Sequence, residues 1–135
     1  MTHGIIGKKI GMTQVFQSDG RVVAVTAIEA GPCFVTQVKT VARDGYNAVQ
    51  LGFGEAKRLN SPQKGHLKEI GMLKHLCEFE VDGIDEMWRG QKIDAGLLQT
   101  GDLVDVTGVS KGRGFVGAVG RFKGYRGPKT HGQSD

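Results

Sequence analysis

Residues 34–53 read FVTQVKTVARDGYNAVQLGF, which is two short apolar stretches joined by the turn sequence RDGY. An Asp-Gly pair is typical of a tight turn between antiparallel strands, because such turns favour positive φ. In the second stretch Val49, Leu51 and Phe53 share one face, since strand side chains alternate with a period of two. The stretch therefore predicts two antiparallel strands with one apolar face.

Similar patterns occur upstream and downstream of this pair. Residues 10–16 and 22–30 are joined by another Asp-Gly turn, and almost every residue of 21–28 is apolar. Such a run predicts a strand that is covered on both faces or closed into a barrel. Residues 75–83 alternate again, and residues 90–109 end in a strand with Val104 and Val106 pointing inward.

One segment has a helical pattern instead. Ser61 is a plausible N-cap, Pro62 suits the first helical position, and Gly71 is a plausible stop. These residues predict a short helix near 62–70. Six or so short strands with glycine turns and one small helix favour a mainly β fold, a Greek-key β-barrel.

Charge divides the chain into two parts. Residues 1–107 carry 12 basic and 13 acidic side chains, whereas residues 108–135 carry 6 basic side chains and one acidic side chain. A basic tail on a nearly neutral body usually marks a polyanionic partner. We therefore expect a barrel body over 1–107 and a basic, glycine-rich extension over 108–135.

The extension contains a GxGxxG pattern, formed by Gly112, Gly114 and Gly117. A dinucleotide site would also need a βαβ unit and an acidic residue on a second strand, which residues 118–135 do not offer. RNA binding fits the segment better, because arginine and lysine meet phosphates and aromatic rings stack on bases. A solvated, disordered basic tail is the alternative. If the segment is helical, Phe115, Val119 and Phe122 would form an apolar stripe.

Other chemistry is weakly supported. Cys33 and Cys77 lack metal-site spacing, so we expect two reduced, partly buried thiols and no metal. No nucleophile–base pair or cofactor motif is evident, so an enzyme is not expected. The apolar runs are too short to span a membrane, and the N-terminus does not resemble a targeting peptide. No membrane partner is therefore expected.

Six stretches carry a family resemblance: GIIGKKIGMTQVF, AIEAGPCFVTQVKT, DGYNAVQLGFGEAK, GHLKEIGM, DVTGVSKGRGFVG and GPKTHG, in this order. Together they closely resemble the bacterial and organellar large-subunit ribosomal protein L-three family over essentially the whole chain. The resemblance implies a translation-type β-barrel and an extension that enters the large-subunit rRNA toward the peptidyl transferase centre. It also implies a structural role in subunit assembly, without enzyme activity, on ribosomes of the bacterial cytoplasm or of a mitochondrion or plastid.

The expected partners are large-subunit rRNA and neighbouring large-subunit ribosomal proteins. The rRNA-binding residues expected from charge, aromaticity and the family motifs are Lys8, Lys9, Ser110, Lys111, Arg113, Phe115, Arg121, Lys123, Tyr125, Arg126, Lys129 and His131.

Two departures from the family pattern matter. Gly120-Arg121 stands where many relatives have a lysine-arginine pair, which removes one expected phosphate contact. The family also continues past the THG element and returns to the barrel, so the barrel is expected to be incomplete here. A second fragment that completes it is therefore a further expected partner, unless the chain is shortened or continues beyond Asp135. The other functional hypothesis is a translation-factor-like barrel, which binds a protein or nucleotide and uses the basic tail as a tether.

Overall fold

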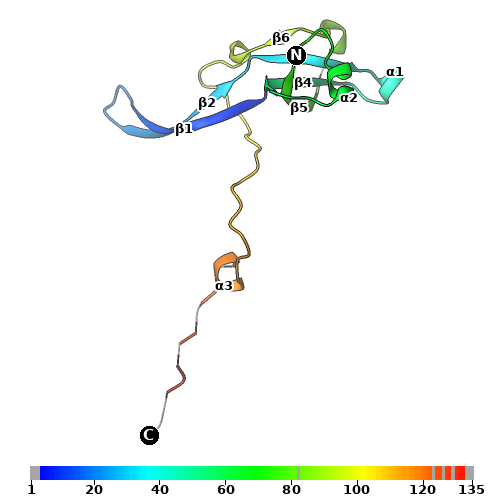
Figure 1. Ribbon diagram of the computed structural model, residues 1–135. Helices are drawn as coiled ribbons and strands as arrows, with labels where there is room; N and C mark the ends of the chain where they lie inside the picture. Colours follow the sequence, from blue (N-terminus) through cyan, green and yellow to red (C-terminus); the bar gives the residue numbers. More distant parts are fainter. Residues whose placement is uncertain (1–3, 82, 123, 126, 129, 133–135) are drawn as a thin grey trace. The chain divides into compact units, whose positions relative to one another are not determined.

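A computed structural model describes residues 4–81, 83–122, 124–125, 127–128 and 130–132. The chain divides into two units, Met1–Asp102 and Leu103–Asp135 (Figure 1). All of the described strands belong to the first unit, and the described part of the second unit contains one short helix.

The first unit contains two antiparallel sheets. β1 (Gly7–Phe16) pairs with β2 (Val22–Ala30) in a two-stranded sheet. The other sheet has the strand order β5-β4-β3-β6, with bounds Leu73–Glu80, Ala48–Glu55, Cys33–Lys39 and Lys92–Ile93. The fold is thus mainly β, as predicted.

The helices are short and lie between strands or after them. Their bounds are α1 Val41–Asp44, α2 Ser61–His66, the 3-10 helices η1 Ile84–Glu86 and η2 Ala95–Leu97, and α3 Ala118–Arg121 in the second unit.

The antiparallel pair predicted within residues 34–53 is confirmed as β3 and β4. Val35 lies opposite Leu51, and Cys33 lies opposite Phe53. The turn between the strands includes α1 and then Gly45, whose φ of 88° is a left-handed conformation that glycine adopts without strain. The Asp-Gly pair therefore ends the short helix and directs the chain into β4.

The core of the first unit forms on one face of β3 and β4. Its buried residues are Cys33, Val35, Val49, Leu51, Phe53, Val81 and Ile93. Val49, Leu51 and Phe53 are the three residues that the alternation places on one face. Burying a valine or leucine side chain contributes about 1.5–3 kcal/mol, so this face accounts for much of the stability of the sheet.

The other face of β4 is also closely packed, at Gly52. A Cβ atom on Gly52 would lie 3.0 Å from the Thr36 methyl group and would collide with the side chain of Leu73. Leu73 itself is buried. Glycine is required here because the Leu73 side chain from β5 occupies the space where a side chain of residue 52 would lie.

The helix predicted near 62–70 is present but is shorter and begins earlier. Asn60, rather than Ser61, is the N-cap, and its backbone N–H donates to Gln63 Oε1 at 3.1 Å. Pro62 lies in the first turn. Backbone N–H groups there have no partner within the helix, so proline, which lacks an N–H, costs no helical hydrogen bond. The helix ends at His66, and the following turn inserts Leu67 into the buried interior.

The strand predicted over residues 21–28 is present as β2, but the described residues neither cover it on both faces nor close it into a barrel. In the β1–β2 hairpin the exposed fraction is 68% for Phe16, 67% for Met12 and 52% for Val22. Neither strand pairs with any other described strand, and the described residues form no closed barrel. The apolar side chains of the hairpin therefore lie at the surface, where no other described element covers them.

The strand predicted at the end of residues 90–109, with Val104 and Val106 inward, is also absent from the described residues, because no described strand pairs with this segment. Val106 is 75% exposed and Leu103 is fully exposed. An alternating pattern alone does not form a strand, because the backbone N–H and C=O groups also need a neighbouring strand.

Candidate nucleic-acid interface

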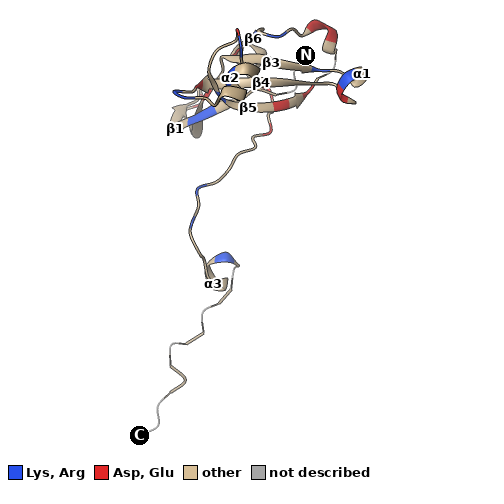
Figure 2. Ribbon diagram, turned by 45° about the vertical axis from the view of Figure 1, so that its right-hand side comes forward, with Lys and Arg blue, Asp and Glu red and all other residues tan. Residues whose placement is uncertain are grey.

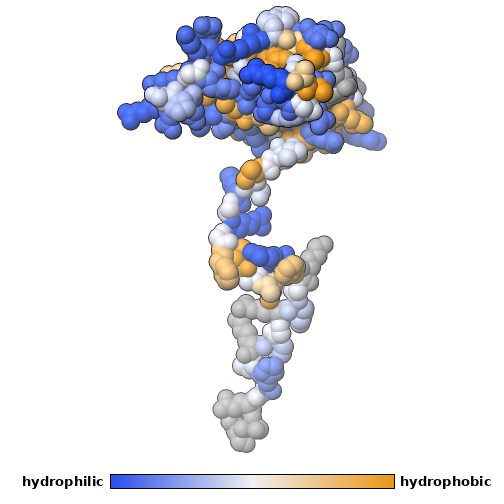
Figure 3. Space-filling model, turned by 90° about the vertical axis from the view of Figure 1, so that its right-hand side faces the viewer, coloured by the Kyte–Doolittle hydropathy of each residue, from blue (hydrophilic) through white to orange (hydrophobic). Residues whose placement is uncertain are grey.

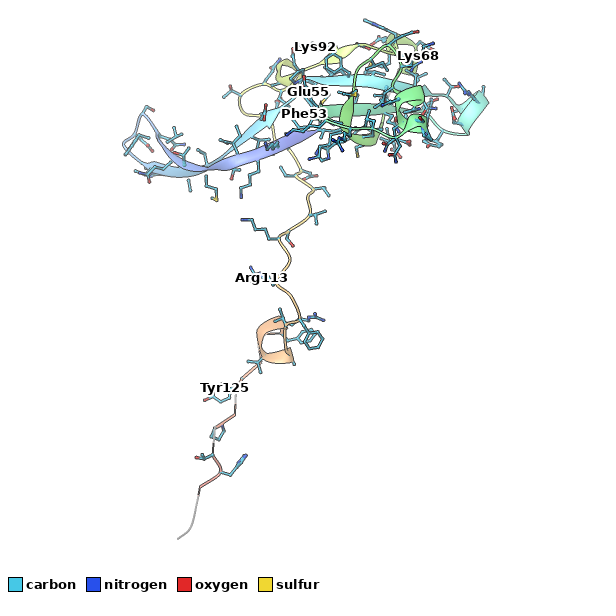
Figure 4. All side chains as sticks on the ribbon, in the orientation of Figure 1. Phe53, Glu55, Lys68, Lys92, Arg113 and Tyr125 are labelled. Atoms are coloured by element: carbon cyan, nitrogen blue, oxygen red, sulfur yellow. The ribbon has the colours of Figure 1, made fainter. Side chains whose placement is uncertain are left out.

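Three described cations of the second unit are exposed: Lys111, Arg113 and Arg121. None of them forms an ion pair with a described carboxylate. Figure 2 shows basic residues in blue along this segment, and Figure 4 shows the Arg113 side chain extending from the backbone into open space. These cations can therefore meet phosphates without first breaking an ion pair to a described group.

Aromatic rings accompany the charges. Phe115 is fully exposed, and Tyr125 is 95% exposed, so both faces of each ring are open to a stacking partner. Figure 3 shows hydrophobic residues in orange and hydrophilic residues in blue interleaved along this unit. Exposed rings beside cations are the combination that single-stranded nucleic acid binds by stacking and phosphate contact.

The apolar stripe expected from Phe115, Val119 and Phe122 is not formed, because the helix is only one turn long. α3 begins after the N-cap Gly117 and ends before Phe122, whose backbone is extended. Phe115 thus lies outside the helix, while Val119 and Phe122 are exposed. Arg121 occupies the last turn, where a cation interacts favourably with the free carbonyl groups.

Glycines of this unit leave open space beside the backbone. A Cβ atom on Gly112, Gly117 or Gly127 would have no neighbour within 4 Å, and Gly114 adopts a φ of 67°. No described strand leads directly into the GxGxxG pattern, so the strand–turn–helix unit of a dinucleotide site is not formed by the described residues. The glycines instead allow a partner to approach the backbone closely.

The remaining predicted residues of this unit fall into two groups. Ser110 and His131 are exposed. Lys123, Arg126 and Lys129 lie outside the described residues.

Lys8 and Lys9 lie on β1, far along the chain from the second unit. Both are exposed, and Lys8 lies opposite Glu29 while Lys9 lies opposite Ile28. Adjacent residues of a strand point to opposite faces, so the two ammonium groups do not form one patch. A flat partner on one face of the hairpin can therefore contact only one of the two lysines.

The four-stranded sheet carries an ion pair that sequence reasoning missed. Lys39 Nζ lies 2.7 Å from Glu78 Oε1 and donates to the Tyr46 hydroxyl at 2.7 Å, while that hydroxyl donates to Glu78 Oε2 at 2.9 Å. Hydrogen bonds from Lys39 and Tyr46 lower the pKa of Glu78, and the bond to Glu78 raises the pKa of Lys39. The three residues come from β3, β5 and the loop before β4, so no local pattern reveals them.

The thiols differ from the expectation of two partly buried side chains. Both are free, but Cys33 is buried and Cys77 is exposed. Burial raises the pKa of the Cys33 thiol, which makes it a poor nucleophile. Among the described residues, no group of three or more His, Cys, Asp or Glu side chains could hold a metal ion.

No helix in the described part of the chain is long and apolar enough to cross a membrane.

Comparison with known proteins connects these features to a family, although no family model matches the chain. The chain is 51% identical over 136 residues to the large ribosomal subunit protein uL3 of Carboxydothermus hydrogenoformans, covering 98% of this chain and 65% of that protein. It is 53% identical over its whole length to uL3 of Dehalococcoides mccartyi, covering 66% of that protein. Against uL3 of Desulfitobacterium hafniense it is 48% identical over 98% of its length, covering 64% of the relative. The chain thus spans slightly less than two thirds of these relatives.

Proposed function

The chain belongs to the uL3 family of large ribosomal subunit proteins, and we propose on this basis that it is a non-enzymatic, structural rRNA-binding component of a bacterial large subunit. The observation that carries the proposal is identity of about one half over essentially the whole chain to proteins of that name. The relatives compared here are bacterial, which favours the bacterial cytoplasm over an organelle.

We assign the RNA contact mainly to the extension, residues 108–135. Its exposed cations Lys111, Arg113 and Arg121 would neutralise phosphates, and the rings of Phe115 and Tyr125 would stack on unpaired bases. The open space beside Gly112 and Gly117 would let RNA reach the backbone. In this proposal the extension is directed into the subunit toward the peptidyl transferase centre, and it becomes ordered against the RNA.

For the first unit we propose a Greek-key barrel of translation type that is completed by polypeptide other than the described residues. Support comes from the β1–β2 hairpin, which exposes Met12, Phe16 and Val22. Further support is that the chain covers only 64–66% of the relatives' length. A second fragment, or a neighbouring ribosomal protein, would cover these apolar faces.

The salt dependence of rRNA binding tests the proposal. Each phosphate contact contributes about 0.7–0.9 to the slope of log affinity against log salt concentration. The variant Lys111→Ala/Arg113→Ala/Arg121→Ala should therefore lower the slope by about 2 to 3 in binding to large-subunit rRNA.

The matched control removes three cations from the first unit, with the variant Arg21→Ala/Arg43→Ala/Lys92→Ala. This variant should keep the wild-type slope.

Equal slopes for the wild type, the extension variant and the control variant would contradict the assignment of the RNA contact to the extension. A wild-type chain that migrates apart from large subunits in a sucrose gradient at moderate salt would contradict the function itself and favour the translation-factor-like alternative.

A further inference from the structure

One segment of the first unit carries basic but no acidic side chains, between the exposed Glu55 and Glu69. Residues 56–68, here called the basic segment, hold four of the twelve basic side chains of residues 1–107 and none of the thirteen acidic ones. The four are Lys57, Arg58, Lys64 and Lys68, and all are exposed. None of them forms an ion pair with a described carboxylate. The rest of this nearly neutral body is therefore acidic on balance.

The backbone of the basic segment is fixed at both ends. At its start, Ala56 is buried and its N–H donates to the Met72 carbonyl at 2.8 Å. Near its end, Leu67 is buried with an exposed fraction of 4%. Between these anchors, the hydrogen bond from the Asn60 N–H to Gln63 holds the first turn of α2.

Two polar side chains add further ties to α2. Arg89 Nη2 donates to the carbonyl oxygens of His66 at 2.8 Å and Lys68 at 3.2 Å, where the helix leaves carbonyl groups without helical partners. His66 Nε2 lies 2.7 Å from Gln50 Oε1, which also accepts from the Thr36 hydroxyl at 2.8 Å. The end of α2 is thus joined both to the four-stranded sheet and to the loop before β6.

We propose that the basic segment is a second rRNA-binding surface, which meets the phosphate backbone through its four exposed cations. Charge complementarity to a polyanion supports RNA as the occupant, and the inference rests on the proposed ribosomal function. Because the backbone is already held, binding orders only the cationic side chains and not the chain itself. Figure 4 shows Lys68 at this surface, on the same unit as the core residue Phe53.

Arg89 acts in this proposal as a positioning residue rather than a phosphate ligand. Its guanidinium already binds two carbonyl oxygens and holds the segment in place. Both hydrogen bonds come from Nη2, so an uncharged, shorter side chain such as glutamine would not hold the two carbonyl groups in this way. Loss of Arg89 should therefore weaken RNA binding by loosening the segment, while the number of phosphates contacted stays the same.

The test compares the salt slopes of charge-matched variants in binding to isolated large-subunit rRNA. The variant Lys57→Gln/Arg58→Gln/Lys64→Gln/Lys68→Gln should lower the slope by about 3, since four contacts contribute about 0.7–0.9 each. The control Arg21→Gln/Arg43→Gln/Lys74→Gln/Lys92→Gln removes the same charge elsewhere on the unit and should keep the wild-type slope. Circular dichroism checks that both variants keep their strands.

Arg89→Gln, which removes the charge, gives a second readout. It should reduce affinity at every salt concentration with an unchanged slope, whereas a slope reduced by about 0.7–0.9 would make Arg89 a phosphate ligand and overturn its positioning role.

The outcomes separate this inference from the proposed function. A wild-type slope for the basic-segment variant, in a chain that still binds rRNA through its extension, overturns the inference and leaves the function intact. The basic-segment variant could also keep the wild-type slope but no longer co-sediment with large subunits. That result would assign the segment to a protein partner and would also overturn the inference. Failure of the wild-type chain to bind rRNA would overturn the function.

Discussion

The four-stranded sheet and the second unit differ in what covers their apolar side chains. In β4, Val49 and Leu51 are fully buried against β3, whereas Val104 and Val106 are exposed although they alternate with polar residues in the same way. The basic side chains differ in the same way: Lys111, Arg113 and Arg121 form no ion pair with a described carboxylate, while Lys39 in the sheet is paired with Glu78. An apolar or charged residue therefore has a structural role only where a neighbouring element supplies its partner.

The largest expected effect tests the difference in packing. Leu51→Ala should lower the free energy of unfolding by about 2–5 kcal/mol, because it removes buried methyl groups and leaves a cavity. Val106→Ala should change it by no more than about 0.5 kcal/mol, since this side chain is exposed. Urea unfolding measures both. A loss at Val106 comparable to that at Leu51 would mean that residues 103–107 pack against a partner element after all.

A pair of glycines tests the same difference in the backbone. Gly52→Ala should destabilise the chain by about 1–3 kcal/mol, because the new Cβ collides with Leu73 and crowds Thr36. Gly112→Ala should leave the stability unchanged, because the space around it is open.

If Gly112 lets rRNA approach the backbone, Gly112→Ala should still weaken rRNA binding in the same salt titration that tests the extension. Stability is read from thermal unfolding and affinity from filter binding. Unchanged affinity for Gly112→Ala would remove the role proposed for this glycine.

The smallest effect concerns pH. The pKa of Glu78 is lower in the folded chain than its usual value of 4.5. At a pH below 4.5, the unfolded chain therefore binds a proton at this carboxylate more readily than the folded chain does. The free energy of unfolding should therefore fall as pH drops from 4.5 through the folded pKa. The raised pKa of Lys39 acts at the other end, where stability is lost as pH rises above 10.5 toward the folded pKa.

Glu78→Gln should remove the part of the acid-side loss that arises from this pair, and the size should be modest because the pair is partly exposed. Thermal unfolding between about pH 3 and 6 measures it. Glu80→Gln, on the same strand, is the matched control. If both variants show the same pH profile, the ion pair does not contribute.

Much of the first unit could be predicted from local pattern. The Asp-Gly turns and the alternation of Val49, Leu51 and Phe53 correctly predicted the antiparallel pair and its core face, because turn chemistry and period depend on neighbours in the chain. The helix was found from Pro62 but given the wrong N-cap, since Asn60 and Ser61 are both good capping residues. Which side chains contact RNA stays a prediction for the whole predicted set.

The sequence by itself determined the family, the mainly β character of the fold and the separation of a basic, glycine-rich segment from a nearly neutral body. The family follows from the resemblance of the six motifs, and the other two follow from composition, period and local turn chemistry. Only the tertiary structure decided that the hairpin is exposed, that Val104 and Val106 form no described strand, and that Arg89 and Gln50 hold α2. The physical reason is that burial, strand pairing and long-range hydrogen bonds require partners distant in the chain, such as Arg89 and His66, whose meeting no local pattern encodes.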